Sequence, residues 1–309
     1  MKKQSISSVM SAFGALSIMV IVSTHQAHAQ SGTSTDFVPP KVFQAAGPTI
    51  SSIQSSVNEF RTALGDPNNL NVSGPLERGR REINWDGGGN NPITAIAGNP
   101  FTGFQLTRGA IFTTPNGTGF VQAPPFADPV QFPPGGLVGV FDNPTYAAIF
   151  SAFSPLRLFS AIGSNIMEVD FVVPGGDNRP ATVTGFGAVF TDVDQPDGSG
   201  PGGKHGNRGA STLMEYFGAD GALLFSSFVP AAPGDGSLSF FGIVFDDARI
   251  AQVRITSGDV APGPDDGGKS KAVQQPPNPF GRRTEGASGP TLDIVMTDDF
   301  IYGEPQPLP

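Results

Sequence analysis

The segment 181–194, ATVTGFGAVFTDVD, constrains the fold more than any other stretch of this chain. Phe186, Ala188 and Phe190 fall on one side of an extended segment, and residues such as Gly187 and Val189 fall on the other. This period of two predicts a strand, and the small or apolar residues on both sides indicate burial of both faces. The interior glycines indicate a close backbone approach or a bend.

Further segments of this kind occupy the second half of the chain, separated by turns rich in Gly, Pro and Asp. Short strands at such intervals, with few helices between them, pair in an antiparallel manner. The expected fold class is therefore all-β, an antiparallel, jelly-roll-like β-sandwich with long Gly/Pro-rich loops. The seven expected strands are 165–173, 181–191, 211–217, 223–228, 237–245, 250–256 and 291–302.

One amphipathic helix is expected near the N-terminus. Ile53, Val57, Phe60 and Leu64 recur at spacings of three and four residues, which is the period of one helix face. Gly65 follows as a stop signal. We expect the apolar stripe of this helix to pack on the sheet as a lid.

The first 29 residues are typical of a secretory signal peptide. Lys2 and Lys3 precede an apolar stretch over 10–22, and a small-x-small site predicts cleavage between Ala29 and Gln30. The apolar stretch is shorter than the roughly 20 residues of a membrane-spanning helix. The sequence thus predicts a secreted or periplasmic protein whose mature chain has no transmembrane segment.

The remaining organisation is predicted from composition. A flexible, Gly/Pro-rich excursion without apolar period is expected at 257–290. The other expected parts are a flexible leader at 30–42, the helix and a turn region at 43–78, a single sandwich domain at 79–305 and a tail at 306–309.

Charge and residue content exclude several function classes. The chain has 18 Lys and Arg against 27 Asp and Glu, and without Lys2 and Lys3 the mature chain has a net charge of −11. No basic cluster interleaved with aromatics occurs, so nucleic acid is not an expected partner. The chain has no cysteine, and His205 is the histidine that remains after the signal. We therefore expect no disulfide, and no haem, nucleotide or zinc cofactor.

Acidic residues after the central strand predict a cation site. Asp192 and Asp194 project to the same side at the strand end, and Asp197 stands in the glycine-rich loop that follows. Calcium prefers six to eight oxygen ligands, to which such carboxylates contribute. The alternative is that an acidic protein simply has acidic loops.

A second acidic pair, Asp298 and Asp299, lies in the closing strand, and Asp86 lies in the opening one. First and last strands are often neighbours in a jelly roll, so these carboxylates are expected to come together. They are additional candidate ligands for the ion.

Two strands carry carboxylates that suit glycosidic chemistry. Glu168 and Asp170 match the opening of the E-x-D-x-x-E motif of bacterial laminarinases and lichenases, but Val173 stands where the second glutamate belongs. Retaining hydrolysis needs two carboxyl groups about 5–5.5 Å apart. Glu215 in a nearby strand is the candidate replacement. The alternative is a half-exposed strand without catalysis.

Trp85, the one tryptophan, allows two interpretations: a sugar-stacking platform or a core residue. The charged residues just before it, Arg80, Arg81 and Glu82, are expected to form a solvated, partly ion-paired start of the first strand.

Four motifs stand out along the chain: the FR-x-x-LG helix, GRREINWDG, GFGAVFTDVD and the closing DDFIYGEP. Together they resemble an uncharacterised family of secreted bacterial β-sandwich proteins. The likeness extends over most of 43–305, and it implies an exported sandwich with no particular activity. The GEP close is also similar to the start of the sorting tail on some exosortase-handled proteins, but no apolar helix or basic end follows it here.

Three functions follow as hypotheses. The leading one is a secreted, non-catalytic module that binds a glycan or an envelope or matrix component and is stabilised by calcium. The second is a carbohydrate-active enzyme that uses Glu168, Asp170 or Glu215. The third is a structural protein of the cell envelope or an exopolymer.

Overall fold

The computed structural model describes residues 38–87, 91–127, 135–194, 212–264 and 292–308. The expected signal peptide with its cleavage site, most of the expected leader, Asp197, His205 and most of the 257–290 excursion lie outside these ranges. Among the described residues, no helix combines the length and the apolar character needed to cross a membrane.

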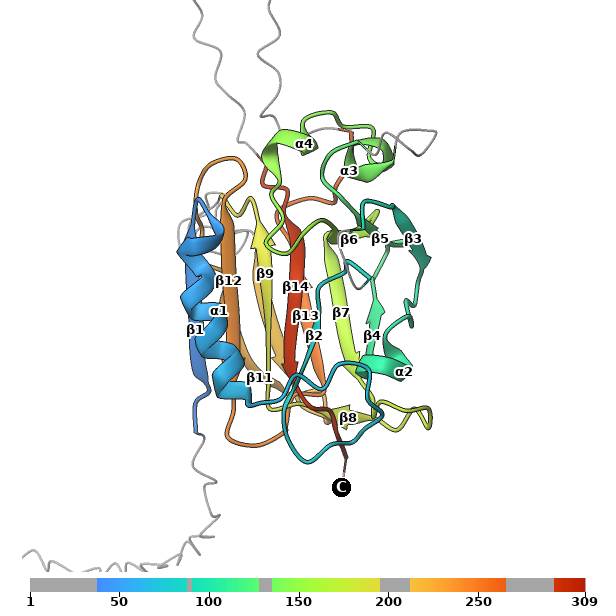
Figure 1. The fold of residues 1–309 in the computed structure, drawn as a ribbon, viewed down its shortest axis with the longest axis vertical. Coiled ribbons are helices and arrows are strands. Elements are labelled where there is room, and N and C mark those ends of the chain that lie inside the picture. The colour runs from blue at the N-terminus through green and yellow to red at the C-terminus, as the bar shows by residue number, and fades with distance from the viewer. Residues whose placement is uncertain (1–37, 88–90, 128–134, 195–211, 265–291, 309) are drawn as a thin grey trace, which may run out of the picture. The chain divides into compact units, whose positions relative to one another are not determined.

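The larger sheet is antiparallel and has the strand order β1-β12-β9-β14-β6-β5-β3, with β2 paired to β14. Figure 1 shows these strands side by side across the domain. The strands are β1 (Lys41–Gly47), β2 (Arg80–Ile83), β3 (Ala95–Gly98), β5 (Gly119–Ala123), β6 (Leu158–Ile162), β9 (Gly185–Thr191), β12 (Leu238–Val244) and β14 (Met296–Gly303).

The second sheet has the order β11-β10-β13-β7-β4, also antiparallel. Its strands are β4 (Ala110–Thr113), β7 (Ile166–Phe171), β10 (Leu213–Phe217), β11 (Leu223–Phe228) and β13 (Gln252–Thr256), and a small ribbon pairs β8 (Ala181–Thr182) with β15 (Gln306–Pro307). Both sheets pack against each other, which confirms the all-β sandwich. The jelly-roll strand order is not confirmed.

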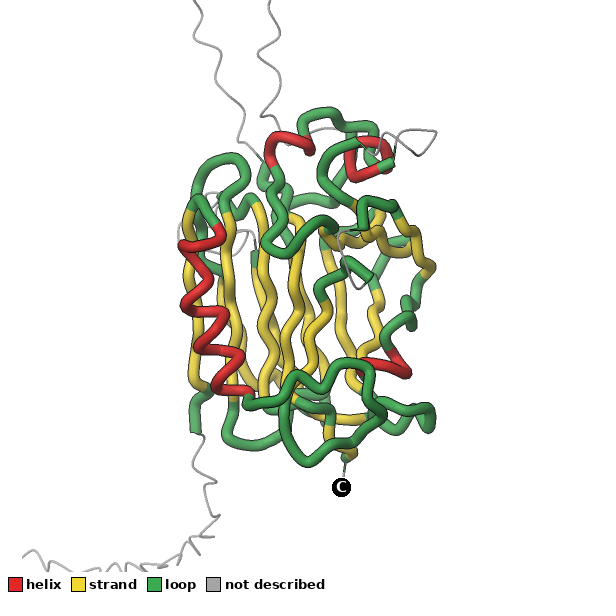
Figure 2. Tube along the Cα trace, viewed as in Figure 1, coloured by secondary structure: helices red, strands yellow, loops and turns green. Residues whose placement is uncertain are grey.

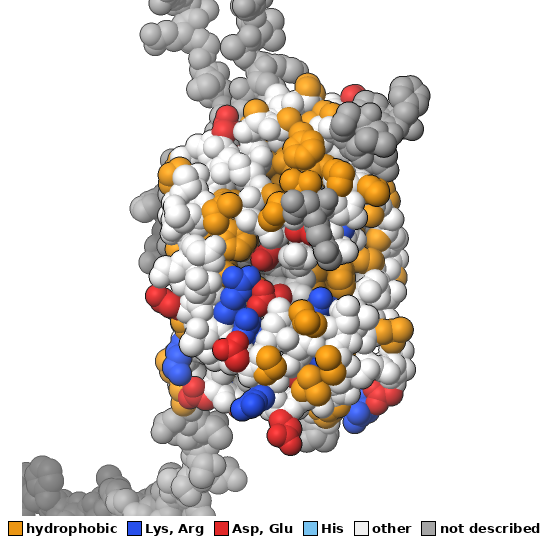
Figure 3. Space-filling view, viewed as in Figure 1, with side chains coloured by type: hydrophobic (Ala, Val, Ile, Leu, Met, Phe, Trp, Pro, Cys, Tyr) orange, Lys and Arg blue, Asp and Glu red, His pale blue; other side chains and the backbone are white. Residues whose placement is uncertain are grey.

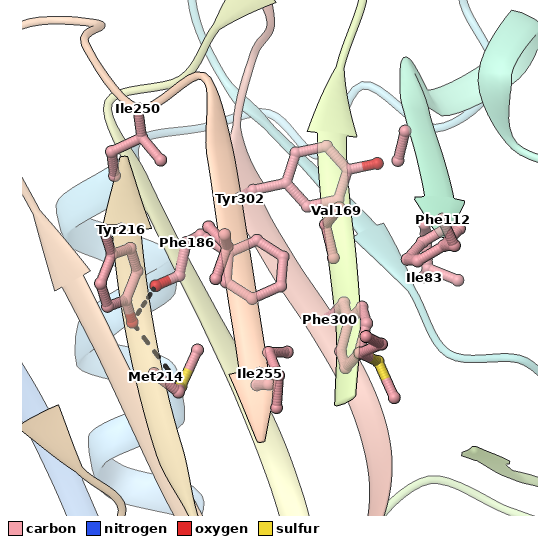
Figure 4. Close-up of a cluster of buried hydrophobic side chains, with 14 of the residues drawn as sticks. Ile83, Phe112, Val169, Phe186, Met214, Tyr216, Ile250, Ile255, Phe300 and Tyr302 are labelled. Carbon is pink, nitrogen blue, oxygen red and sulfur yellow. Dashed lines mark hydrogen bonds between the residues drawn. The ribbon is translucent and has the colours of Figure 1, made fainter. Parts of the chain in front are cut away.

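The main core lies between the two sheets. Phe186 of β9 and Phe300 of β14 contact each other from the larger sheet at a ring distance of 5.4 Å. Phe171 of β7 reaches across to Tyr302 at 5.3 Å, and the Tyr216 hydroxyl donates to the Phe186 carbonyl at 3.2 Å. Figure 4 shows Phe186, Phe300 and Tyr302 of the larger sheet and Tyr216 of the second sheet projecting into one cluster.

The central strand is buried on both faces, as its alternation predicts. Phe186, Ala188 and Phe190 belong to the core between the sheets, whereas Val189 packs in a separate cluster beneath helix α1. The segment 181–191 is divided, however, since β8 ends at Thr182 and β9 begins at Gly185.

Helix α1 (Ile50–Leu64) covers the outer face of the larger sheet, along β1 and β12 in Figure 1. Its buried residues Ile53, Val57, Phe60 and Leu64 are the predicted stripe. The Phe60 ring lies over Gly187, where an added Cβ would stand 2.9 Å from it. The glycine predicted to permit a close approach therefore accommodates an aromatic ring of the lid.

Strand β1 was not expected, because its residues fall in the predicted leader and helix region. It begins at Lys41 and pairs along its whole length with β12. Its outward side chains are exposed, so the sequence carries little apolar alternation here. The pairing partner, which is distant in the chain, determines this strand.

Three short helices lie in the loops, and Figure 2 shows them outside the strands. Two of them, with parts of β5 and β6, form a third apolar cluster around Tyr146 and Phe150. The helices are α2 (Gln105–Arg108), α3 (Gly136–Val140) and α4 (Tyr146–Ile149).

Candidate functional site

A cleft of about 510 Å³ opens beside helix α1, where β2 and β14 meet. Charged side chains of both signs gather next to a hollow in the middle of the face drawn in Figure 3. The cleft is lined by Gln54 and Arg61 of α1, by Asn68, Leu70, Glu82, Asn84 and Arg108, by Phe153, Ser154 and Pro155, and by Asp299 of β14.

A β-bulge in β14 delivers two adjacent carboxylates to this region. The register with β9 shifts between Thr297 and Phe300, so Asp298 and Asp299 occupy the irregular position. Consecutive residues of a regular strand point to opposite faces, and a bulge re-aims them. Both carboxylates consequently contact the same residue, Ser154.

Three carboxylates surround the Ser154 hydroxyl, and we call them with Ser154 the Ser154 cluster. The Oγ atom lies 2.7 Å from Asp299, 3.1 Å from Asp86 and 3.2 Å from Asp298. The backbone N–H of Phe153 also donates to Asp298 at 2.6 Å. The expected meeting of Asp86 with the acidic pair is confirmed, since β2 pairs with β14.

The Ser154 cluster shifts the protonation of its members. Burial raises the pKa of Asp298 well above its usual range, and the charge of Asp299 adds to the effect. Burial raises the pKa of Asp299 to about 6, against the opposing hydrogen bond from Ser154 and the charge of Arg61. Burial also raises the pKa of Asp86. A hydroxyl has one proton to donate, so neighbouring buried carboxyls favour their neutral forms.

An ion-pair network forms one wall of the cleft. Arg61 Nη2 lies 2.8 Å from Glu82 Oε2 and 3.4 Å from Asp299 Oδ2. The other oxygen of Glu82 accepts from Arg80 Nε at 2.7 Å. Two carboxylates thus share one guanidinium, which holds helix α1 against β2 and β14.

The prediction that Arg81 is solvated was wrong. Its side chain is fully buried and forms two bonds of 2.6 and 2.7 Å with Glu304, which follows β14. The third guanidinium nitrogen donates to the backbone carbonyls of Leu70, Val72 and Thr107. The glutamate of the closing GEP motif therefore neutralises a buried arginine of the opening strand.

Trp85 is a core residue, so the sugar-platform interpretation was wrong. The side chain is 1% exposed and stacks on Phe159 with a ring distance of 3.7 Å. Its indole N–H donates to the Asp298 carbonyl at 2.8 Å. An indole enclosed in this way has no face available to a pyranose ring.

Asp192, Asp194 and Asp293 form the acidic group with metal-ligand spacing in the described part of the chain. Each offers a carboxylate oxygen, and these oxygens lie within 4.8 Å of one another. Asp192 and Asp293 are each 1% exposed. The pairing of Asp192 and Asp194 was anticipated, whereas Asp298 and Asp299 belong to the Ser154 cluster and do not join this group.

Asp293 was missed by sequence reasoning, although a signal for it exists. Strand β9 ends just before Asp192, and β14 begins just after Asp293. Because the two strands are antiparallel neighbours, the end of one lies beside the start of the other. The position of Asp293 before β14 identifies it as a neighbour of Asp192 only when the pairing of β9 with β14 is known.

The candidate catalytic residues Glu168, Asp170 and Glu215 lie on the second sheet. Arg254 forms a 2.6 Å ion pair with Glu168 and stands opposite Glu215 in the strand register. A cavity of about 360 Å³ on this sheet is lined by Asp170 as its one carboxylate. Burial raises the pKa of Asp170, and the nearby charge of Glu168 adds to the effect. Both carboxylates are bonded to β13, Glu168 to Arg254 and Asp170 to Gln252 Nε2 at 2.9 Å.

Comparisons of the chain with protein-family models, with curated proteins and with solved structures found no match. The likeness to secreted bacterial sandwich proteins therefore remains a prediction from motifs. The function has to be argued from the geometry of the cleft and of the acidic group.

Proposed function

We propose that this chain is a secreted, non-catalytic β-sandwich module that binds a glycan or another envelope or matrix component in the α1–β2 cleft. The observation that carries this proposal is the cleft itself. Its volume of about 510 Å³ falls in the range of small-molecule sites. Its lining combines amides and charges with a few apolar side chains, a mixture that suits a polyhydroxylated ligand.

The amides of the cleft keep hydrogen-bonding capacity for a ligand. Gln54 Nε2 donates to Asn58, and the side-chain oxygens of Asn68 and Asn84 each accept one backbone N–H. The Nδ2 groups of both asparagines donate to no described residue. Hydroxyl groups of a sugar would take these positions as acceptors.

The carboxylates of the cleft favour binding over catalysis. Both oxygens of Glu82 accept from arginines, and both oxygens of Asp299 contact Ser154 or Arg61. A nucleophile or base has to give up such partners before it can react. The ion pairs therefore support a rigid recognition surface.

A glycan array with the mature chain, residues 30–309, tests the proposal. Asn84 is exposed at the cleft, so Asn84→Trp should fill it and abolish binding without unfolding the domain. The matched control is Ile96→Trp, on the exposed surface of β3 outside the cleft. Equal binding by both variants, or no bound glycan for the wild type, would contradict the proposal.

One observation favours a carbohydrate-active enzyme as the second candidate, with residues other than those expected. Glu82 and Asp299 share Arg61, and Asp299 has a pKa raised to about 6 by burial. A carboxylic acid poised in this way suits a general acid. Release of reducing ends from a polysaccharide panel, lost in Asp299→Asn and in Glu82→Gln, would establish the enzyme in place of the binding module.

We also propose calcium at Asp192, Asp194 and Asp293. Two of these carboxylates are buried, and one oxygen of each of the three lies within 4.8 Å of the others, which is a donor set that a hard cation such as calcium prefers. Backbone N–H groups also donate to the group: Asp194 N donates to Asp293 at 3.2 Å, and Gly234 N donates to Asp194 at 2.8 Å. Backbone carbonyls and water would complete the oxygen shell of the ion.

A further inference from the structure

Arg108 is a cation of the cleft without a partner among the described residues. It lies at the end of α2 and lines the cleft together with Arg61 of α1. No described residue accepts a hydrogen bond from its guanidinium, and its Nε and Nη1 atoms are buried without a partner. By contrast, the Arg61 guanidinium bonds Glu82, Asp299 and Asn58.

An arginine in this state is unfavourable for the folded chain alone. Burial lowers the pKa of Arg108, and the charge of Arg81 acts in the same direction, whereas Tyr302 and Glu82 act against it. Buried guanidinium groups are normally paired, because their five donors lose water without replacement otherwise. A residue that lowers the stability of the fold and lies in a cleft is expected to have a functional role.

From these contacts we infer that Arg108 is an anion-binding residue and that the ligand of the cleft is a saccharide bearing a carboxylate, such as a uronic acid. This inference rests on the proposed function and adds the class of glycan. The planar guanidinium matches a carboxylate in a two-point hydrogen bond. The asparagine amides supply donors for the ring hydroxyls beside it.

The charges near Arg108 favour a singly charged ligand group. Glu82 and Asp299 face the same cleft; Arg61 pairs with both of them, and Arg80 pairs with Glu82 and with Asp66. Arg108, in contrast, has two buried guanidinium nitrogens that donate to no described residue, and these are left for the ligand. A multiply sulfated or phosphorylated ligand would bring more negative charge than Arg108 balances beside these carboxylates.

Calorimetric titration of the mature chain with a galacturonate oligosaccharide and with its neutral galactose counterpart tests the inference. The uronate should bind about ten- to a hundred-fold more tightly, which is the value of a charge-assisted hydrogen-bonded pair. Arg108→Met should remove this preference, and Arg108→Lys should weaken it. The control Arg179→Met, at an exposed arginine outside the cleft, should retain it.

The melting temperature separates a ligand-binding role from a structural one. Since the Arg108 guanidinium donates no hydrogen bond to a described residue, Arg108→Met should melt at the same or a higher temperature than the wild type. A clearly lower melting temperature together with unchanged uronate affinity would overturn the inference. Tighter binding of a sulfated oligosaccharide than of the uronate would overturn the carboxylate assignment.

Failure of the inference differs from failure of the proposed function. Equal affinity for the uronate and the neutral oligosaccharide would remove the role of Arg108 and leave glycan binding intact. If no saccharide binds, the proposed function fails. In that case, an absence of any rise in melting temperature with millimolar galacturonate would overturn the anion site as well.

Discussion

At the residue scale, the ion pair between Arg81 and Glu304 links strand β2, in the GRRE segment, to the closing GEP motif. Both side chains are almost completely enclosed, with exposures of 0% and 2%. Removal of one partner of a buried ion pair leaves an uncompensated charge in the interior. Two charged residues that are far apart in the sequence are therefore paired in the interior.

Glu304→Gln should lower the free energy of unfolding by about 3–5 kcal/mol, because it leaves the Arg81 charge without its counterion. Urea denaturation followed by fluorescence of Trp85 would measure the change. The control is Asp246→Asn, which removes an exposed partner of Lys41 and should change stability by less than about 1 kcal/mol. Similar changes in the free energy of unfolding for both substitutions would show that the buried pair contributes no more to stability than the exposed pair.

The Ser154 cluster predicts a pH dependence of stability. The folded-state pKa of Asp299 is raised to about 6, above the value of about 3.9 for an unfolded Asp. The folded state therefore binds more protons, and this stabilisation is present below pH 4 and lost as the pH rises through 6. The contribution of Asp299 is on the order of 3 kcal/mol.

Asp299→Asn should reduce the loss of stability between pH 4 and pH 7, since the amide does not ionise there. Chemical denaturation at several pH values would give the slope of unfolding free energy against pH for the wild type and for the variant. Asp247→Asn, at an exposed carboxylate, is the control and should leave the wild-type slope unchanged. A slope equal to that of the wild type in Asp299→Asn would exclude this carboxyl as the source of the dependence.

At the element scale, the alternation of β9 and the stripe of α1 are complementary. Gly187 and Gly242 lie beneath Phe60, and each added Cβ would stand 2.9 Å from that ring. The small residues of two neighbouring strands thus form a shallow seat for the helix lid. Such contacts make a core sensitive to a single added methyl group.

Gly187→Ala should lower the free energy of unfolding by about 1–3 kcal/mol, because its methyl group meets both Phe60 and the Gly242 backbone. Thermal melting followed by circular dichroism would detect this. Gly98→Ala, in β3, is the matched control, since no heavy atom stands within 4 Å of its added Cβ. Phe60→Leu combined with Gly187→Ala should recover part of the loss. An unchanged melting temperature in Gly187→Ala would contradict the close packing of Phe60 on Gly187 and Gly242.

At the scale of the whole molecule, the chain is stabilised without disulfides, because it contains no cysteine. In the described part of the chain, apolar clusters between the sheets, beneath α1 and around Tyr146 account for the packing. Two nearly enclosed carboxylates, Asp192 and Asp293, lie at one end of the β9–β14 pair. The proposed ion would join these two central strands at that end.

Addition of EDTA should lower the melting temperature of the mature chain, and excess calcium should restore it, since an ion that binds the folded state stabilises it by mass action. Calorimetry would record both shifts. Asp293→Asn should abolish the response to EDTA and calcium, whereas Asp246→Asn, outside the acidic group, should keep it. A melting temperature that changes neither with EDTA nor with added calcium would reject the proposed ion.

Residue periodicity alone determined the fold class, helix α1 and the approximate position of seven strands. Alternation and the three-to-four spacing reflect burial of one or both faces, which is a local property of the chain. The same alternation anticipated that β9 is buried on both sides and that its glycines permit close contact. It did not reveal β1, whose outward residues are exposed.

Only the tertiary structure decided which charges meet. Arg81 pairs with Glu304, and Asp192 lies close to Asp293. The bulge directs Asp298 and Asp299 toward Ser154. These partners are far apart in sequence, or are adjacent residues that a regular strand would separate. Strand pairing and the bulge are decided by the packing of the whole sandwich. The charge contacts, the cleft and the position of Arg108, whose guanidinium bonds no described residue, follow from them.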